Sequence, residues 1–204
     1  MKKIILSVLL FAAILSLKSQ EIKYTDASEL NLIGKPFPDT PNPYHRIDTL
    51  VFKGFNTTEN RQVRCPVGMS VLFKSNTTKI TMSTNWGYVY NTVSTMPIAF
   101  RGYDLYFKNE RGEWQYAASG ANRNYQEGKE DTFTLIENMD GTERDFMLYL
   151  PMYSEIHSCK IGIDKDAYIE PIESDFRHRI AVYGSSFTQG VSTTRAGMSW
   201  PMQF

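Results

Sequence analysis

A long series of short apolar runs limits what this chain can fold into. Between residues 47 and 171, apolar and polar residues alternate over a few positions at a time, and turn residues such as Asn76-Thr77-Thr78 separate the runs. Alternation with a period of two gives a β-strand one apolar face, and no window of twelve or more residues here repeats its apolar residues with a helical period. We therefore expect a mainly β domain over residues 21–176, a jelly-roll-like β-sandwich.

The expected strands lie in six stretches of this region. They are "DTLVFKGF" (48–55), "MSVLFKSNTTKITMSTN" (69–85), "MPIAFRGYDLYFKNERGEWQYAA" (96–118), "DTFTLIEN" (131–138), "ERDFMLYLPMY" (143–153) and "EIHSCKIGIDKDAYIEPI" (155–172). Upstream, four prolines between residues 36 and 43 exclude a helix and a central strand. Residues 34–48 are therefore expected to form an extended lead-in on the surface.

The first twenty residues have the pattern of a secretory signal peptide. Lys2 and Lys3 form a basic start, an apolar stretch follows from residue 4 to residue 17, and polar residues come next. The stretch is shorter than the ~20 residues that span a bilayer, so we expect cleavage near Gln20 and no stable membrane span afterwards. Retention as an N-terminal anchor is the alternative. We expect an exported bacterial protein, located in the periplasm, at the cell surface or in the medium.

Charge and cysteine content exclude several classes of partner. The chain has 22 basic and 22 acidic residues and no long basic run, which excludes nucleic acid as a partner. Cys65 and Cys159 either form a disulfide, which export would permit, or are two small buried apolar residues. Two cysteines and three scattered histidines do not make a metal site, and we expect neither a metal nor another cofactor.

The composition changes near residue 171. "IAVYG" (180–184) is a continuous apolar run of the kind that is buried on both faces in a parallel sheet, and the residues after it do not alternate. We expect residues 177–204 to form the first strand, loop and helix of a second, α/β domain.

This loop contains a candidate nucleophile, Ser186. A serine at a strand-to-helix turn projects its hydroxyl outward, and its own backbone N–H faces a developing oxyanion. Ser185 precedes it, Gly184 permits a tight passage of the chain, and Gly190 permits a close approach of a substrate or another backbone. The alternative is an ordinary helix N-cap, in which a serine side chain accepts from the first N–H groups of the helix.

Several motifs together resemble a known family. "YGSSFTQG" followed by "TRAGMSWP" is similar to the first block of the SGNH (GDSL-like) hydrolases, and "GYDLY" (102–106) resembles the GxDLY signature of a β-domain that precedes such hydrolases. "FMLYLPMYSEIHSCKIGID" resembles the late strands of that β-domain. The resemblance implies a flavodoxin-like catalytic domain with Ser186 as nucleophile. Ser185 stands where the family most often has Asp, and Ala196 stands where its Arg-Pro motif has Pro.

The resemblance also implies what residues 177–204 do not contain. In SGNH hydrolases the catalytic His and Asp lie close to the C-terminus, and further oxyanion donors, a Gly and an Asn, come from middle blocks. His178 lies only eight residues before Ser186 and is expected to be a surface residue. We therefore expect this chain to be the N-terminal part of a secreted esterase for acylated carbohydrate or a similar small ester, inactive by itself.

A non-catalytic function is the alternative. In this hypothesis the chain is a carbohydrate-binding β-sandwich, and Trp86, Trp114, Tyr88 and Tyr90 stack on sugar rings. The same aromatic residues are equally typical of a core or of cross-strand pairs. Asp104 of "GYDLY" is disfavoured inside a strand, and we expect it to anchor a turn or a hydrogen-bond arrangement of the domain rather than to contact a ligand.

Overall fold

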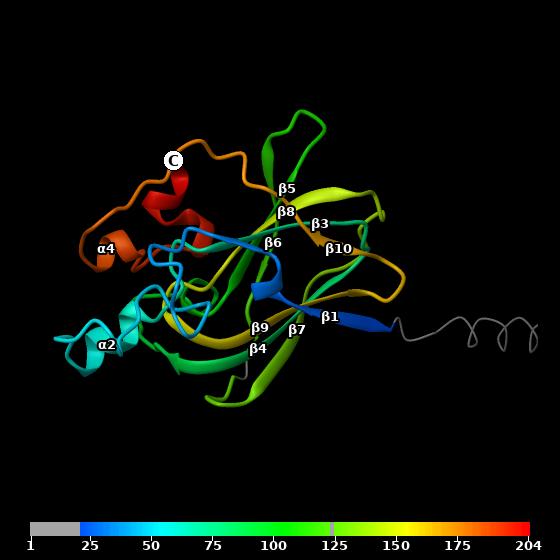
Figure 1. Cartoon of the computed structure of the whole chain (residues 1–204). Helices are drawn as coiled ribbons and strands as arrows, with labels where there is room; N and C mark the ends of the chain where they lie inside the picture. Colours follow the sequence, from blue (N-terminus) through cyan, green and yellow to red (C-terminus); the bar gives the residue numbers. More distant parts are fainter. Residues whose placement is uncertain (1–20, 123–124) are drawn as a thin grey trace, which may run out of the picture.

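The computed structural model describes residues 21–122 and 125–204, and within them it shows two antiparallel β-sheets stacked face to face (Figure 1). One sheet has four strands in the order β1-β9-β4-β7. The other has six, in the order β10-β3-β8-β5-β6, with β2 also paired to β3. The mainly β class is confirmed, and the open, antiparallel sheets agree with a β-sandwich; the flavodoxin-like part is not seen.

The elements have the following bounds. The four-stranded sheet contains β1 (Ile22–Asp26), β4 (Ile80–Val89), β7 (Glu130–Ile136) and β9 (Ser154–Asp164); the other sheet contains β2 (Asn31–Ile33), β3 (Ser70–Ser75), β5 (Tyr103–Lys108), β6 (Trp114–Gly120), β8 (Arg144–Tyr149) and β10 (Ile169–Pro171). The helical turns are η1 (Ala27–Glu29), α2 (Thr57–Val63), α3 (Pro97–Phe100), α4 (Ser186–Gln189), η2 (Ala196–Met198) and η3 (Trp200–Gln203).

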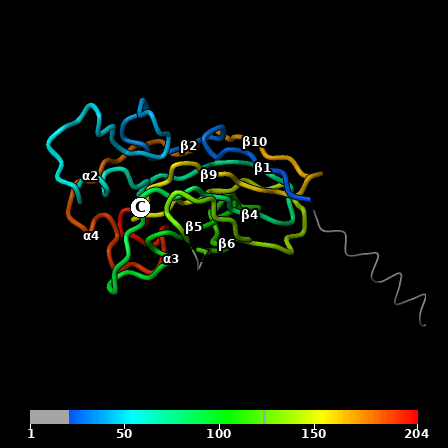
Figure 2. The backbone as a smooth tube through the Cα atoms, turned by 90° about the horizontal axis from the view of Figure 1, so that it is seen from below, coloured from blue at the N-terminus to red at the C-terminus, as the bar shows by residue number. Residues whose placement is uncertain are grey.

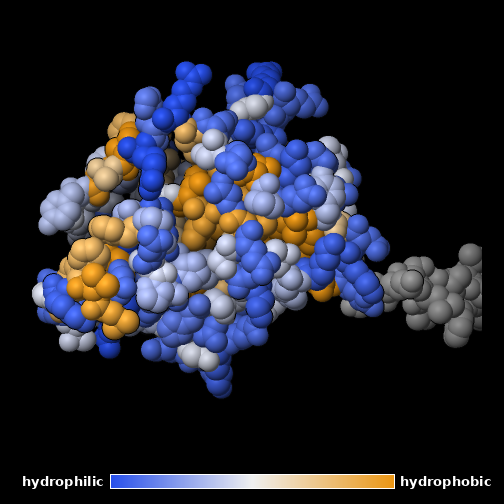
Figure 3. All heavy atoms as spheres, viewed as in Figure 1, coloured by the Kyte–Doolittle hydropathy of each residue, from blue (hydrophilic) through white to orange (hydrophobic). Residues whose placement is uncertain are grey.

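Alternation along the strands places one face of each sheet in a shared hydrophobic core. Some apolar residues are also visible at the molecular surface over the sandwich (Figure 3). Phe73 of β3 and Phe146 of β8 are both fully buried, and their rings stack with centroids 5.2 Å apart. Ile80 and Met82 of β4 are buried in the same cluster. Burial of apolar surface at about 25 cal/mol per Å² is what holds the two sheets together.

Several strands that are consecutive in the sequence lie in opposite sheets. Among consecutive strands of the described residues, only β2 and β3, and β5 and β6, lie in the same sheet; at every other connection the chain crosses from one sheet to the other. Strand β4, for example, pairs with β9 and β7, both of which lie later in the sequence. Strands form in most of the six stretches where the sequence predicts them. Strands that follow one another in the sequence, however, are often not hydrogen-bonded to each other.

The expected strand at residues 48–55 does not form. The Asp48 carboxylate accepts the N–H of Leu50, and the Asp48 carbonyl accepts the N–H groups of Val51 and Phe52, so the backbone closes into a turn. Helix α2 follows instead, and its start is a capping box in which Asn56 and Glu59 each bond the other's backbone. The Asn-Thr-Thr-Glu sequence at residues 56–59 is typical of such a helix start.

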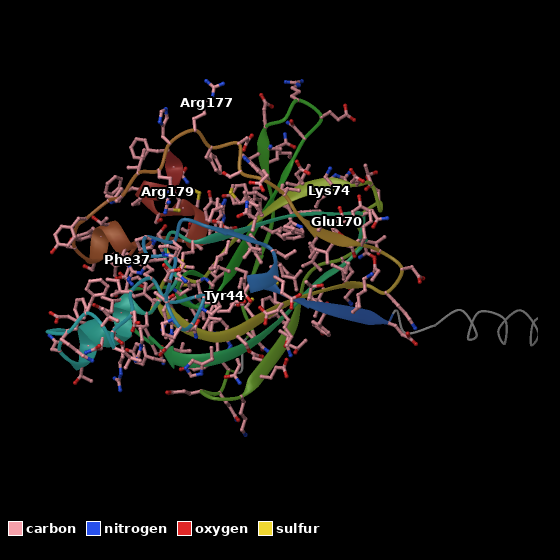
Figure 4. The ribbon with its side chains drawn as sticks, in the orientation of Figure 1. Phe37, Tyr44, Lys74, Glu170, Arg177 and Arg179 are labelled. Carbon is pink, nitrogen blue, oxygen red and sulfur yellow. The ribbon has the colours of Figure 1, made fainter. Side chains whose placement is uncertain are left out.

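The expected strand at "IAVYG" is also wrong. Residues 172–184 have no regular secondary structure, and residues 180–184 are all exposed. A parallel strand needs neighbours to bond, and within the described residues this segment has none, so it runs along the outside of the sandwich (Figures 1 and 2). Arg179 holds it to the lead-in by donating to the Lys35 carbonyl at 2.8 Å, while Arg177 points outward (Figure 4).

Candidate functional site

Ser186 is the first residue of α4 and is exposed. Ser185 occupies the N-cap position, but its side chain makes no capping hydrogen bond. Within residues 21–122 and 125–204, the Ser186 hydroxyl makes no hydrogen bond either. The ordinary N-cap role that the sequence left open is therefore not realised by Ser185, and Ser186 is exposed to solvent.

The backbone around Ser186, in contrast, is held firmly. Its carbonyl accepts the Tyr153 hydroxyl at 3.0 Å and the N–H groups of Gly190 and Val191. Gln189 adds a bond from its side-chain amide to the Met152 carbonyl at 3.1 Å. Burial raises the pKa of Tyr153 to about 12, so its hydroxyl remains a donor at neutral pH. Residues 152 and 153, which lie just before β9, thus clamp α4 to the sandwich.

The two glycines of the segment are required by packing within the chain. A side chain at Gly184 would collide with Thr188 of α4. Gly190 caps α4 with a left-handed φ of 105°, and a Cβ there would lie 2.6 Å from the Met152 sulfur and 2.9 Å from the Ser199 Cβ. The atoms that approach Gly190 closely belong to the side chains of Met152 and Ser199, and the expected approach of a substrate or another backbone stays a prediction.

Asp104 contacts the segment that follows α4. Its side chain is fully buried, and its Oδ2 accepts the Gly197 N–H at 2.8 Å. The same oxygen lies 3.5 Å from Arg195 Nη1, and the Arg195 guanidinium also covers the Tyr116 ring at 4.3 Å. Burial raises the pKa of Asp104 to about 6, against the opposing effects of Arg195 and the Gly197 N–H. The expectation of an anchoring role for Asp104 agrees with these contacts.

No histidine is brought to Ser186 in the described part of the chain. His178 is exposed, as expected, on the segment before α4. His45 and His157 instead lie beside Glu155, with Nε2 to Oε1 distances of 3.0 and 3.7 Å. Within the described residues, no histidine side chain therefore lies beside Ser186.

The aromatic residues proposed for sugar stacking do not share an exposed face. Trp86 is 1% exposed in the core, where its Nε1 donates to a buried carboxylate. Tyr90 packs against Tyr153 with ring centroids 5.4 Å apart. Trp86 therefore cannot stack on a sugar, and the half-buried rings of Trp114 and Tyr88 each lie beneath a cationic side chain.

The two cysteines are both free and both buried, so the disulfide alternative is not realised. Burial raises the pKa of each thiol to about 12, which keeps both protonated and unreactive. Among residues 21–122 and 125–204, no group of three or more His, Cys, Asp or Glu side chains is placed to hold a metal ion. None of the helices in the same residues is long and apolar enough to cross a membrane.

A second buried carboxylate, Glu155, fixes the lead-in and the end of α2 to β9. His45 and Arg64 lie 3.0 and 3.1 Å from its Oε1, and the Tyr88 N–H donates to its Oε2. Burial alone would raise the pKa of Glu155, but the bonds from His45 and Tyr88 and the charge of Arg64 outweigh it and leave the pKa below its usual value.

Replacing Glu155 by glutamine is expected to lower the free energy of unfolding by about 1–2 kcal/mol at pH 7. A lowered pKa gives stability that is present above the unfolded value of 4.5 and is lost as the pH falls through the folded value. The gap between wild type and E155Q should therefore shrink below pH 4.5 in urea unfolding curves. E137Q, at an exposed ion pair with Lys79, is the matched control and should change stability by less than about 0.5 kcal/mol. An E155Q gap that stays constant far into the acid range would contradict this account.

Comparisons with known proteins agree with the motifs. The family model "GxDLY: N-terminus of Esterase_SGNH_hydro-type" matches residues 22–169. A search of the curated proteins gives no match. Among solved structures, a protein described as a GDSL-like lipase from Bacteroides ovatus is 33% identical over 90% of this chain, with a TM-score of 0.81. The salicylyl-acyltransferase SsfX3 of a tetracycline biosynthetic pathway is 12% identical over 78% of this chain and 41% of its own, with a TM-score of 0.41.

The present chain covers 52% of the Bacteroides ovatus protein, so it spans about half the length of that relative. The match includes the signature pentapeptide at 102–106, where Gly, Asp, Leu and Tyr stand at the positions that name the family. The chain therefore belongs to the family of GxDLY-type N-terminal domains of SGNH-hydrolase-type esterases.

Proposed function

We propose that this chain supplies the β-domain and the nucleophile segment of a secreted SGNH-type serine esterase that acts on acylated carbohydrate or a similar small ester. One observation carries the proposal: the Ser186 carbonyl is held by Tyr153, just before β9, while the Ser186 hydroxyl is exposed and unbonded within the described residues. Family membership supplies the reaction class. Export is supported by the basic and apolar pattern of the first twenty residues, which lie outside the described residues.

The chemistry would proceed by acyl transfer to Ser186. Its Oγ gives up its proton and bonds to the ester carbonyl carbon, and the Ser186 N–H, in the first turn of α4 where helix donors are unpaired, donates to the oxyanion. The carbon–oxygen bond to the alcohol then breaks, the alcohol leaves with a proton, and water releases the acid from the acyl-serine. A serine hydroxyl needs a general base for this step. We place that base outside residues 177–204, since His178 makes no bond to Ser186.

The proposal is tested by covalent labelling of Ser186. The chain is treated with a fluorophosphonate reagent and with p-nitrophenyl acetate, and the site is mapped by peptide mass spectrometry. We expect slow labelling, at most one label per chain, on Ser186, and little ester turnover, because within the described residues no base lies beside Ser186 to speed acylation or deacylation.

Two serine variants make the result specific. S186A should lose the label, while S185A, one residue earlier in the same loop, should keep it. Equal labelling of S186A and wild type, or no label on Ser186 in wild type, would sink the proposal.

A further inference from the structure

The signature pentapeptide at 102–106 presents its side chains in two directions. Tyr103 and Leu105 point into the core and are almost fully buried, and the Tyr103 hydroxyl lies 2.7 Å from Thr84 Oγ1. Asp104 and Tyr106 point to the opposite face of β5, because side chains alternate along a strand. That outer face is the one that η2 packs against, with Gly197 against both side chains.

The core side of the pentapeptide explains its apolar positions but not its aspartate. A buried carboxylate is costly unless it is hydrogen-bonded or paired. Within the described residues, the partners of Asp104 are the Gly197 N–H and Arg195, which follow it by 93 and 91 residues. Both partners bond its Oδ2, and its Oδ1 has no partner in the described residues.

Gly197 of η2 packs closely against Asp104 and Tyr106. A Cβ at Gly197 would lie 2.6 Å from Asp104 Oδ2 and 2.9 Å from the Tyr106 hydroxyl, so a glycine is needed there. The Tyr106 ring is fixed by edge-to-face contacts with Tyr116 and Tyr149, at centroid distances of 5.9 and 5.5 Å. Asp104 and Tyr106 thus form a fixed surface against which Gly197 packs.

The segment from Ser186 to Gly197 is held at three points. Tyr153 bonds the Ser186 carbonyl at one end, and Asp104 bonds the Gly197 N–H at the other. Between them, the Ser192 N–H donates to Thr95 Oγ1 at 3.2 Å, and the Ser192 hydroxyl donates to the Ser94 carbonyl at 2.8 Å. Loss of one end would leave α4 attached through the others but free to shift.

We infer that residues 186–199 dock onto the signature pentapeptide at 102–106. Asp104 is then a positioning residue for Ser186, acting through the Gly197 N–H and Arg195. The part concerning Ser186 rests on the proposed function. The docking of residues 186–199 onto β5 does not.

Because Asp104 titrates, the docking of residues 186–199 onto β5 should depend on pH. The groups that face its carboxyl are Arg195 and, through their hydroxyls, Tyr106 and Tyr149. In the docked state the pKa of Asp104 is about 6, and exposure on undocking would return it towards 3.8. The docked state therefore binds more protons between these two values, and docking should strengthen as the pH falls from neutral through this range.

The first test follows docking itself. Amide hydrogen exchange is measured by mass spectrometry over residues 186–199, and the Gly197 amide is followed by NMR against pH. In wild type this amide should titrate with a midpoint near pH 6. D104A should speed exchange of residues 186–199 by about tenfold or more, because a hydrogen bond to a charged group is lost. D104N should restore most of the protection, since its amide oxygen can accept from Gly197, but should abolish the titration.

A matched control separates docking from general stability. Asp164 is another buried carboxylate, bonded to Thr77 and to the Thr78 N–H at the far end of β9. D164A should loosen the sandwich without selectively exposing residues 186–199. If D104A does not fold, G197A gives the same information from the other side of the contact. Equal protection of residues 186–199 in wild type, D104A and G197A would overturn the inference, as would a Gly197 amide that does not titrate.

The second test concerns Ser186. D104A should slow fluorophosphonate labelling of Ser186 by about tenfold at unchanged stoichiometry, and D104N should recover most of the rate. Unchanged labelling in D104A with faster exchange would overturn the positioning role. If labelling never depends on Ser186, the proposed function fails, while the exchange experiment still decides whether Asp104 docks the segment.

Discussion

Replacing Trp86 by alanine is expected to lower the free energy of unfolding by about 3–5 kcal/mol, the usual cost of removing a large buried aromatic side chain. Trp86 lies between the sheets with 1% of its surface exposed, and its ring is 6.3 Å from that of Tyr103. Truncation would leave a cavity and would also remove the donor to the Asp131 carboxylate. Urea unfolding followed by far-UV circular dichroism measures the effect without relying on tryptophan fluorescence.

Trp200 provides the matched control. It lies in η3, is 47% exposed, and contacts Phe204 edge-to-face. W200A should cost clearly less than W86A, because about half of the Trp200 surface is already exposed to solvent in the folded chain. A W86A variant no less stable than W200A would mean that Trp86 is not a core residue, and the carbohydrate-stacking hypothesis would return.

Replacing Gly102 by alanine is expected to cost about 2–3 kcal/mol, as for other substitutions that add atoms where there is no space. A Cβ at this first signature position would collide with the backbone carbonyl of Ile98 in α3. Helix α3 cannot move away freely, because the Phe100 carbonyl accepts the Tyr153 N–H at 3.1 Å and the Ser154 hydroxyl at 2.5 Å. The same urea titration reports the loss.

Gly112 separates the steric effect from the conformational one. It has a left-handed φ of 77°, and no atom lies within 4 Å of the place that a Cβ would take, so G112A should cost only about 1 kcal/mol of backbone strain. G102A, without a positive φ, should be clearly the more damaging. If the two variants lose the same stability, the contact between Gly102 and Ile98 does not constrain the fold.

Much of the fold could be predicted from the sequence because the strands alternate so regularly. The stretch at residues 69–85 was expected to form strands, and it does; four of its apolar residues, Val71, Phe73, Ile80 and Met82, are fully buried. Pairing could not be predicted, because alternation shows which side of a strand is apolar but not which strand lies beside it. The strand predicted at residues 48–55 was wrong because composition does not reveal local hydrogen bonds. The apolar residues there are typical of a strand, but bonds to Asp48 close the backbone into a turn.

The candidate site was only half visible in the sequence. Ser186 and its glycines could be located because the motif is local, and α4 does begin at Ser186. The groups that hold the loop could not, since Tyr153 and Asp104 are separated from their partners by 33 and 93 residues. The lack of alternation after residue 171 did not show where this segment packs: residues 186–199 are held by Tyr153, by the loop at residues 94–95 and by Asp104 of the signature strand.

The interleaving of the strands has a consequence for synthesis on the ribosome. Strand β1 pairs with β9, from Ile22 opposite Asp164 to Asp26 opposite Lys160, and β4 needs both β7 and β9 as partners. The emerging polypeptide can therefore bury little apolar surface until Asp164 has left the exit tunnel. Folding then requires contacts distant in sequence, which form slowly. We expect the nascent chain to remain largely unfolded until the whole of β9 has been synthesised.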